Sequence, residues 1–521
     1  MRMERHIIGV WRRNAWRSRA EPRAPLYERT SRNTAMPLTR IKDRSLLQTG
    51  AYINGQWRQS GRSFDVTDPG TGQIIANVSN GDAVETLQAI DAAAAALNVW
   101  RTQTARVRSN VLRRWFELIQ EHRDDLATLI TAEGGKPYAE ALGEVAYAAS
   151  FVEWFAEEAR RVNGEIIPPN ASDKRLLVTR EPVGVCAAIT PWNFPAAMIT
   201  RKVAPAIAVG CTVIVKPAEQ TPLTALALAV LAERAGIPAG VLNVVTGDAA
   251  AAPAIGGALT ADSRVRKLSF TGSTQVGRLL MAQSAPTLKR LSLELGGNAP
   301  FIVFEDADLD AAVDGAIASK YRNSGQTCVC ANRFLVHANV VDAFAAKLAA
   351  KVAALPVGYG FEQGAQIGPL IDAAGLDKVK TLVADAVSQG ATIVCGGAPD
   401  ARGGLYFQPT VIKGVRENMR MMREEIFGPV APLFAFNDEA DAIRMANATE
   451  FGLAAYFYTR DTARVFRVSE ALEYGMVGVN TGLMSSEVAP FGGVKQSGFG
   501  REGSIHGVDE YLSYKYTCLG L

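Results

Sequence analysis

Apolar residues recur three and four positions apart in two early segments, 84–100 and 106–133, and this spacing predicts amphipathic helices. After residue 184 the pattern changes to short apolar runs that alternate with helical periods. Strands are predicted at 185–190, 212–215, 241–245 and 267–270, and helices at 205–209, 222–235 and 274–284. Repeated strand–helix units of this length predict a parallel, doubly wound sheet.

A second series of the same kind follows Glu294. Its predicted strands are 301–304, 333–336, 391–394, 453–458 and 475–479, with helices at 309–321 and 340–355. This series predicts a second α/β domain. The C-terminal segment 509–516 alternates in the β manner, and a terminal strand must pair somewhere. The sheet edge of another subunit is one solution, so we expect a homodimer or homotetramer.

The length and composition are those of a globular protein with two or three domains. The chain has 521 residues, of which 48% are hydrophobic and 21% are charged. No apolar run approaches the roughly 18 residues that a membrane span needs. We therefore expect no membrane association.

The net charge of +3 comes from the N-terminus. Residues 1–35 hold nine arginines and three glutamates, and the remainder has 46 basic and 49 acidic residues, a net charge of −3. The body is mildly acidic, which argues against a nucleic-acid partner. The extension 1–35 is either a mitochondrial transit peptide or the product of an upstream start codon, and in neither case part of the fold. We favour the upstream start, which places the protein in a bacterial cytoplasm; a transit peptide would place it in the mitochondrial matrix.

The cysteines and histidines exclude several kinds of site. The six cysteines are scattered, a pattern typical of a reducing compartment. The four histidines are far apart and none has metal-ligand spacing, so we expect neither a metal site nor a Ser-His-Asp hydrolase.

Two residues suggest covalent chemistry. Cys328 follows Gly325, Gln326 and Thr327, and Glu294 stands 34 positions upstream, before Gly296-Gly297. A thiolate can attack a carbonyl carbon, and a carboxylate can activate the water that releases the product. Taken singly, Cys328 could be a buried structural thiol and Glu294 an ordinary surface residue.

Seven motifs in order make the chain resemble the aldehyde dehydrogenase superfamily, and within it the succinate-semialdehyde branch, from about residue 46 to residue 521. The motifs are Pro191-Trp192-Asn193-Phe194-Pro195, Lys216-Pro217-Ala218-Glu219, Phe270-Thr271-Gly272-Ser273, Glu294-Leu295-Gly296-Gly297, Gly325-Gln326-Thr327-Cys328, Glu424-Glu425-Ile426-Phe427-Gly428-Pro429 and Pro490-Phe491-Gly492-Gly493.

The resemblance implies a fold of two doubly wound α/β domains plus a small β oligomerisation element. It implies an NAD-binding domain, a catalytic domain and a bridging element, with boundaries at 36–163 and 183–293, at 294–486, and at 164–182 and 487–521 respectively.

The resemblance also assigns catalytic roles. Cys328 attacks the aldehyde, Glu294 is the general base, and the Asn193 amide and the Cys328 backbone N–H form the oxyanion hole. The implied reaction is oxidation of succinate semialdehyde to succinate in 4-aminobutyrate degradation. Glutarate semialdehyde, one methylene longer, is the alternative substrate. A cysteine esterase without hydride transfer, or a non-catalytic homologue, would also be compatible with parts of the pattern.

The implied cofactor is NAD, with NADP possible. Its expected ligands are Trp192, Lys216, Glu219, Gly272, Ser273, Gly277, Glu425 and Phe427. The Glu219 carboxylate can accept hydrogen bonds from both ribose hydroxyls and would repel a 2′-phosphate, which favours NAD. The expected contacts to the substrate carboxylate are Arg201, Arg322 and Ser485.

Cys330 has two interpretations. It is either a small apolar core residue or, as in some members of the succinate-semialdehyde branch, the partner of Cys328 in a reversible disulfide.

Overall fold

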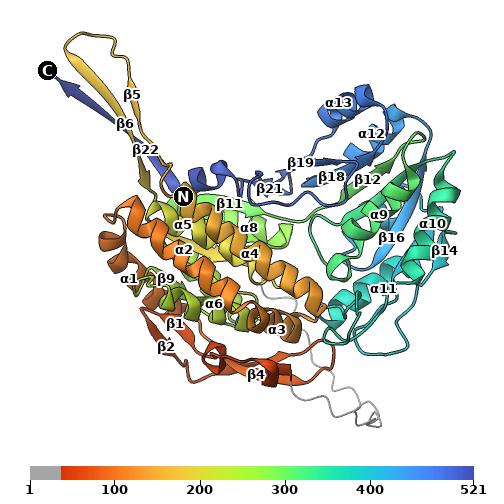
Figure 1. Ribbon diagram of the computed structural model, residues 1–521, viewed down its shortest axis with the longest axis horizontal. Helices are drawn as coiled ribbons and strands as arrows, with labels where there is room; N and C mark the ends of the chain where they lie inside the picture. Colours follow the sequence, from red (N-terminus) through yellow and green to blue (C-terminus); the bar gives the residue numbers. More distant parts are fainter. Residues whose placement is uncertain (1–36) are drawn as a thin grey trace, which may run out of the picture. The chain divides into compact units, whose positions relative to one another are not determined.

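Two large sheets dominate the computed structural model, which describes residues 37–521 (Figure 1). The predicted extension 1–35 lies outside the described residues. Residues 37–521 form a single compact unit, so the domain boundaries inferred from the sequence stay predictions.

The first sheet has eight strands in the order β2-β1-β9-β8-β7-β10-β11-β21. The strands are β1 (Ala51–Ile53), β2 (Gln56–Arg58), β7 (Val185–Ile189), β8 (Thr212–Lys216), β9 (Leu242–Val244), β10 (Val265–Thr271), β11 (Arg290–Glu294) and β21 (Gly498–Phe499). The five strands from β9 to β11 are parallel. Buried on both faces, they read as near-continuous apolar runs.

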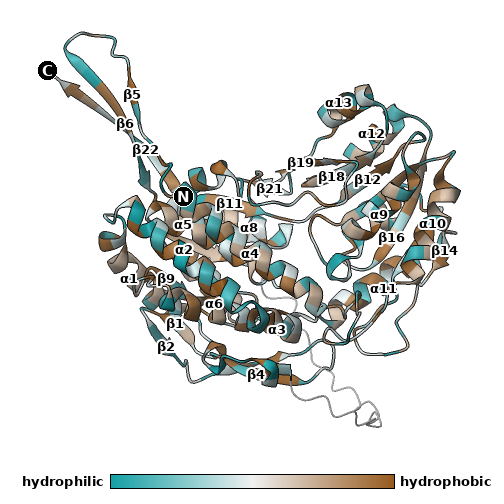
Figure 2. Ribbon diagram, in the orientation of Figure 1, coloured by the Kyte–Doolittle hydropathy of each residue, from teal (hydrophilic) through white to brown (hydrophobic). Residues whose placement is uncertain are grey.

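Eight helices belong to this half of the chain: α1 (Ala83–Trp100), α2 (Ala105–Glu121), α3 (Arg123–Gly134), α4 (Tyr138–Glu158), α5 (Ala197–Val209), α6 (Pro222–Arg234), α7 (Ala252–Ala261) and α8 (Thr274–Ser284). α4 packs against α2, α3 and α5. In Figure 2 the outer helices such as α2 show brown and teal on different sides, as expected for elements with one buried face.

The second sheet has seven strands in the order β14-β15-β16-β13-β12-β18-β19, all parallel except the β14–β15 pair. The strands are β12 (Ala299–Val303), β13 (Ala331–His337), β14 (Thr392–Cys395), β15 (Thr410–Lys413), β16 (Val430–Phe436), β18 (Ala454–Tyr458) and β19 (Met476–Val479). The associated helices are α9 (Leu309–Lys320), α10 (Val341–Ala353), α11 (Ala373–Ser388), α12 (Glu439–Asn447) and α13 (Thr462–Ala471).

A three-stranded antiparallel sheet forms an arm that extends from the body (Figure 1). Its strands are β5 (Glu165–Ile167), β6 (Lys174–Pro182) and β22 (Leu512–Gly520). The predicted C-terminal strand is therefore present, but it pairs with β6 of its own chain over nine residues. Short elements complete the description: β3 (Ser63–Thr67) with β4 (Ile74–Ser79), β17 (Phe451–Gly452) with β20 (Val494–Lys495), and 3-10 turns at Pro37–Arg40, Arg44–Leu46, Ala285–Thr287, Arg322–Gly325, Arg420–Met422 and Ile505–Tyr511.

Three predicted elements differ from the structure. The single helix predicted at 106–133 is two helices, because the chain turns at His122, which ends α2 and precedes α3. The helix predicted at 205–209 begins eight residues earlier, at Ala197. The first residues of the predicted terminal strand form a 3-10 turn, and the strand starts at Leu512. None of the helices in residues 37–521 has the length and apolarity that a bilayer span requires.

Candidate active site

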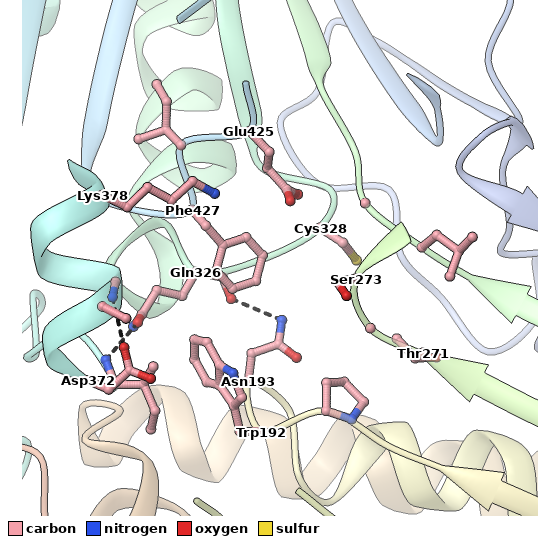
Figure 3. Close-up of a pocket in the computed structure, with 18 of the residues that line it drawn as sticks. Trp192, Asn193, Thr271, Ser273, Gln326, Cys328, Asp372, Lys378, Glu425 and Phe427 are labelled. Carbon is pink, nitrogen blue, oxygen red and sulfur yellow. Dashed lines mark hydrogen bonds between the residues drawn. The ribbon is translucent and has the colours of Figure 1, made fainter. Parts of the chain in front are cut away.

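A cavity of about 370 Å³ lies at the carboxyl ends of parallel strands of the first sheet, where ligands bind in folds of this kind (Figure 3). Strands β7, β10 and β11 each lead directly into segments that line it. The other wall comes from the second half of the chain, including Cys328, the start of α11 and the segment 425–427.

The cavity brings together seven of the residues predicted from the sequence: Trp192, Asn193, Gly272, Ser273, Cys328, Glu425 and Phe427. The other predicted residues do not line it: Lys216, Glu219, Gly277, Arg201, Arg322, Ser485, Cys330 and Glu294. Glu294 is nevertheless adjacent, because Leu295 and Gly296 are lining residues.

The segment before Cys328 has an unusual backbone. Asn323, Ser324 and Gly325 have φ values of 51°, 57° and 77°, three consecutive residues in the left-handed region. Each non-glycine residue there costs roughly 1–2 kcal/mol. A Cβ on Gly325 would also collide with the Gly428 carbonyl group, so glycine is required at that position.

Side-chain hydrogen bonds hold this strained segment in place. A Glu140 carboxylate oxygen accepts from the Asn323 backbone N–H at 2.7 Å, and the Ser324 hydroxyl donates to the Gly368 carbonyl at 2.9 Å. The Gln326 side chain accepts from the Ile371 N–H at 2.9 Å and donates to the Asn323 carbonyl at 3.1 Å. These bonds hold the backbone that leads into Cys328.

The Cys328 thiol is only partly exposed and forms no disulfide. Burial raises its pKa to about 12, and the charges of Glu425 and Glu294 act in the same direction, while Arg201 opposes them. Burial therefore favours the protonated form of this thiol.

Glu294 ends strand β11 with its carboxylate buried at 3% exposure. Neither carboxylate oxygen has a hydrogen-bond partner within residues 37–521. Burial and the nearby Glu502 charge raise its pKa well above the ordinary value, against the opposing effect of Arg201 and Lys202. A base with a raised pKa and free lone pairs is suited to accepting a proton from water.

Glu294 lies near a buried cluster of charged side chains formed by Arg201, Lys202 and Glu502. Glu502 forms ion pairs with both Arg201 and Lys202, and the Lys202 ammonium donates to the Thr271 hydroxyl at 2.7 Å. Thr271 lines the cavity, so this cluster connects the cavity wall with the surroundings of Glu294. Lys202 and Glu502 were not identified from the sequence, because they are 300 residues apart and only the fold brings them together.

The Asn193 amide nitrogen donates to the Gln326 carbonyl at 3.0 Å, which leaves its second N–H free (Figure 3). The Asn193 backbone carbonyl accepts from the Lys136 ammonium at 2.8 Å and from the Asn323 amide at 3.2 Å. Lys136 is itself paired with Glu144 in the interior. Asn193 is thus held from both its backbone and its side chain.

The residues expected to hold a dinucleotide form a suitable surface. The Trp192 and Phe427 rings meet edge to face at 5.6 Å, and Phe427 has a left-handed φ of 55°. Ser273 caps the N-terminus of α8, where backbone N–H groups favour a phosphate. Gly272 and Gly277 leave space that a Cβ would fill against Phe270 and Leu295.

Two further predicted cofactor contacts involve carboxylates. Lys216, which ends strand β8, pairs with Glu219 at 3.2 Å outside the cavity lining, in the location expected for an adenine ribose. Burial raises the Glu425 pKa to about 7, and its carboxylate accepts from the Gly297 N–H at 3.2 Å. Lys378, on α11, faces the same cavity and was not identified from the sequence, because a lone lysine in an amphipathic helix carries no distinguishing signal.

The predicted substrate arginines lie close to aromatic rings. The Arg201 guanidinium is 3.9 Å from the Phe491 ring centroid, and Arg322 is 5.4 Å from that of Phe194. Arg201 Nη2 and Arg322 Nε are buried atoms with no hydrogen-bond partner among the described residues. Ser485 is half-buried in an irregular segment.

Cys330 is buried and its thiol is free. Its sulfur accepts from the Thr327 hydroxyl at 2.8 Å and donates to the Lys320 carbonyl at 3.5 Å. No group of three or more His, Cys, Asp and Glu side chains that could hold a metal occurs within residues 37–521.

Known proteins resemble this chain over almost its whole length. The model of the aldehyde dehydrogenase family matches residues 57–517. A glutarate-semialdehyde dehydrogenase of Pseudomonas aeruginosa is 60% identical over 92% of this chain and 99% of its own length. An NADP(+) succinate-semialdehyde dehydrogenase of Escherichia coli is 59% identical over 92% of this chain and all of its own.

Solved structures agree with the sequence comparisons. The crystal structure of succinate-semialdehyde dehydrogenase from Burkholderia pseudomallei superposes with a TM-score of 0.91 at 61% identity, covering 92% of this chain and all of that one. The predicted fold class is therefore confirmed. With a free thiol in the cavity, an unpartnered carboxylate beside it and this likeness along its length, the chain belongs to the aldehyde dehydrogenase family.

Proposed function

We propose that the protein oxidises succinate semialdehyde to succinate with a nicotinamide dinucleotide as the oxidant. The observation that carries this proposal is the meeting of Cys328 and Asn193 in one cavity with the unpartnered Glu294 carboxylate beside it. An esterase would need the thiol and the base but not the cofactor surface formed by Trp192, Ser273 and Phe427.

In the proposed mechanism the Cys328 thiol gives up its proton to solvent water as its sulfur attacks the aldehyde carbon. The free N–H of the Asn193 amide and the Cys328 backbone N–H donate to the resulting oxyanion. Trp192, Ser273 and Phe427 would hold the dinucleotide, which would supply the hydride acceptor, and loss of the hydride leaves an acyl group on Cys328 as a thioester. Glu294 then takes a proton from the water that hydrolyses the thioester, and its raised pKa favours that transfer.

The anionic end of the substrate would provide an acceptor for two arginine N–H groups that have none in the described chain. Arg201 Nη2 and Arg322 Nε each have a donor without a partner in the described chain, and a carboxylate can accept from both. Ser485 is proposed as a weaker third contact. Glutarate semialdehyde stays as the alternative substrate, because one methylene is worth only about 1–3 kcal/mol of discrimination.

Replacing Arg322 with alanine is expected to lower kcat/KM for succinate semialdehyde by roughly 10- to 100-fold, since a hydrogen bond to a charged group is lost. Butanal has the same chain length without the carboxylate, so its kcat/KM should change little. The measurement is steady-state kinetics of both aldehydes with parent and variant. Equal losses for the two aldehydes would rule out a carboxylate contact at Arg322.

Glu219 supports a preference for NAD over NADP, because its carboxylate would repel a 2′-phosphate. Replacing Glu219 with serine removes the repulsion and keeps a hydroxyl near Lys216, so kcat/KM with NADP should rise relative to NAD by about tenfold, the effect of roughly 1.4 kcal/mol. The parent and the variant are compared with both cofactors at a fixed aldehyde concentration. A parent that is several-fold more efficient with NADP contradicts the preference.

We also propose a homo-oligomer in which the arm takes part. Strand β22 pairs only with β6 among the described strands, and the arm carries exposed apolar side chains at Ile166, Tyr514 and Leu519. An unpaired strand edge with exposed apolar groups favours association with another chain.

A further inference from the structure

Helix α4 presents one face to both catalytic segments. Glu140, Glu144, Tyr147 and Phe151 are spaced by four, three and four residues, which places them on the same side of the helix. Glu140 accepts from the Asn323 N–H before Cys328, and Glu144 accepts from the Ala196 N–H after Asn193 at 2.9 Å. The next residue along this face, Tyr147, has no comparable bond.

The Tyr147 hydroxyl is buried and has no hydrogen-bond partner within residues 37–521. Its ring packs edge to face against Phe151 at 4.9 Å, and the Arg201 guanidinium lies 5.5 Å from the Phe151 ring centroid. A buried hydroxyl without a partner is unfavourable unless another molecule supplies one. Tyr147 therefore packs against the same Phe151 ring as Arg201 and has an unused donor.

The charges around Tyr147 show what kind of partner it would meet. Burial raises its pKa, and both Arg201 and Arg322 act to lower it, so the hydroxyl lies within the field of both guanidinium groups. The charges of Glu502 and Cys328 also reach it and act to raise the pKa. Each arginine has a buried N–H without a partner among the described residues. Tyr147, Arg201 and Arg322 thus each have an unused donor, and Phe151 packs against both Tyr147 and Arg201.

We propose that the Tyr147 hydroxyl donates a hydrogen bond to the anionic end of the substrate and completes, with Arg201 and Arg322, a three-donor site. The inference rests on the proposed function, because it requires a substrate with a second, anionic end. Two carboxylate oxygens have about four acceptor positions, enough for all three donors. Tyr147 then contributes to the selection of charged over neutral aldehydes.

The test replaces Tyr147 with phenylalanine, which keeps the ring and removes the hydroxyl. We expect kcat/KM for succinate semialdehyde to fall by about 10- to 100-fold, mainly through KM, because a hydrogen bond to a charged group is lost. The value for butanal should stay unchanged. Tyr138→Phe is the matched control on the same helix, since the Tyr138 hydroxyl is 3.5 Å from the Asp124 carbonyl and lies outside the proposed site.

Thermal unfolding distinguishes a substrate-binding role of the Tyr147 hydroxyl from a purely structural one. Removing an unpartnered hydroxyl should leave the Tm of the ligand-free variant equal to or above that of the parent. Added succinate should raise the Tm of the parent more than that of Tyr147→Phe, since weaker binding to the native state stabilises it less. A lower ligand-free Tm together with an unchanged succinate effect overturns the assignment.

The outcomes separate this inference from the proposed function. A parent that oxidises butanal as well as succinate semialdehyde overturns the proposed function and the Tyr147 assignment with it. A parent that discriminates, combined with a Tyr147→Phe variant that loses activity equally on both aldehydes, overturns the assignment alone.

Discussion

Replacing Cys328 with serine should lower kcat for aldehyde oxidation by about 10⁴-fold or more, the size seen when a covalent nucleophile is removed. A serine hydroxyl ionises far less readily than a thiol, and no histidine among residues 37–521 lines the cavity to act as its base. The rate of cofactor reduction, followed by absorbance at saturating aldehyde, measures the effect. Aldehyde binding should survive, because the proposed carboxylate donors are untouched.

Cys330→Ala is the control for that experiment. Cys330 is buried and bonded to Thr327 and Lys320, so its removal should leave turnover near the parent value. The same variant tests the proposed disulfide with Cys328. If peroxide inactivation of Cys330→Ala is still reversed by a thiol reductant as in the parent, Cys330 is a core residue and no switch. A large loss of turnover in Cys330→Ala with normal turnover in Cys328→Ser would exchange the roles of the two thiols.

Replacing Glu294 with glutamine should slow steady-state turnover by about 10²- to 10⁴-fold, the usual contribution of a general base. Formation of the thioester does not require Glu294, because in the proposed mechanism this base acts only on the hydrolytic water. Rapid mixing should therefore still show a burst of one reduced cofactor per active site. A burst followed by very slow cofactor reduction would show that the substitution slows hydrolysis and not the earlier steps. Loss of the burst itself would mean that Glu294 acts before the thioester forms.

Because the pKa of Glu294 is raised, the hydrolysis rate and the unfolding temperature of Glu294→Gln should depend on pH differently from those of the parent. In the parent, hydrolysis needs the ionised carboxylate, so its rate should rise as pH increases through the raised pKa, and Glu294→Gln should lose this dependence. Because the pKa of Glu294 is higher in the native state than in the unfolded state, the native state favours the protonated carboxyl. The resulting contribution to the free energy of unfolding is fully present below the unfolded-state pKa and is lost as pH rises through the native-state pKa. Glu294→Gln should therefore unfold at a higher temperature than the parent at alkaline pH. Parallel pH profiles of parent and variant would contradict the role of Glu294.

The parallel strands were predictable because burial on both faces makes them continuous apolar runs, as at Val185–Ile189 and Thr212–Lys216. Helix α4 was missed although it supports the site. It is buried on several sides, with acidic residues such as Glu144 and Glu158 in the interior, so its sequence lacks a clear apolar stripe. Strands β2 to β4 were missed because they are only partly buried and mix polar with apolar residues, so they form no continuous apolar run, and β1 has only three residues.

At the candidate active site, too, some residues could be predicted from the sequence and others could not. Cys328, Glu294 and Asn193 could be proposed because each stands in a distinctive local motif. Glu502 and Tyr147 could not, because their importance comes from burial and from missing or distant partners, which local sequence does not encode. Residues that act through tertiary contacts need the fold before they can be recognised.

The proposed reaction passes through a thioester on Cys328 that is hydrolysed with Glu294 as the base. Its most direct test is intact-protein and peptide mass spectrometry of Glu294→Gln after mixing with NAD and succinate semialdehyde. We expect a mass increase of one succinyl group per chain, located on the peptide that contains Cys328 and absent from the Cys328→Ser/Glu294→Gln double variant. An unmodified chain that has nevertheless reduced the cofactor, or a succinyl group on another residue, would contradict it.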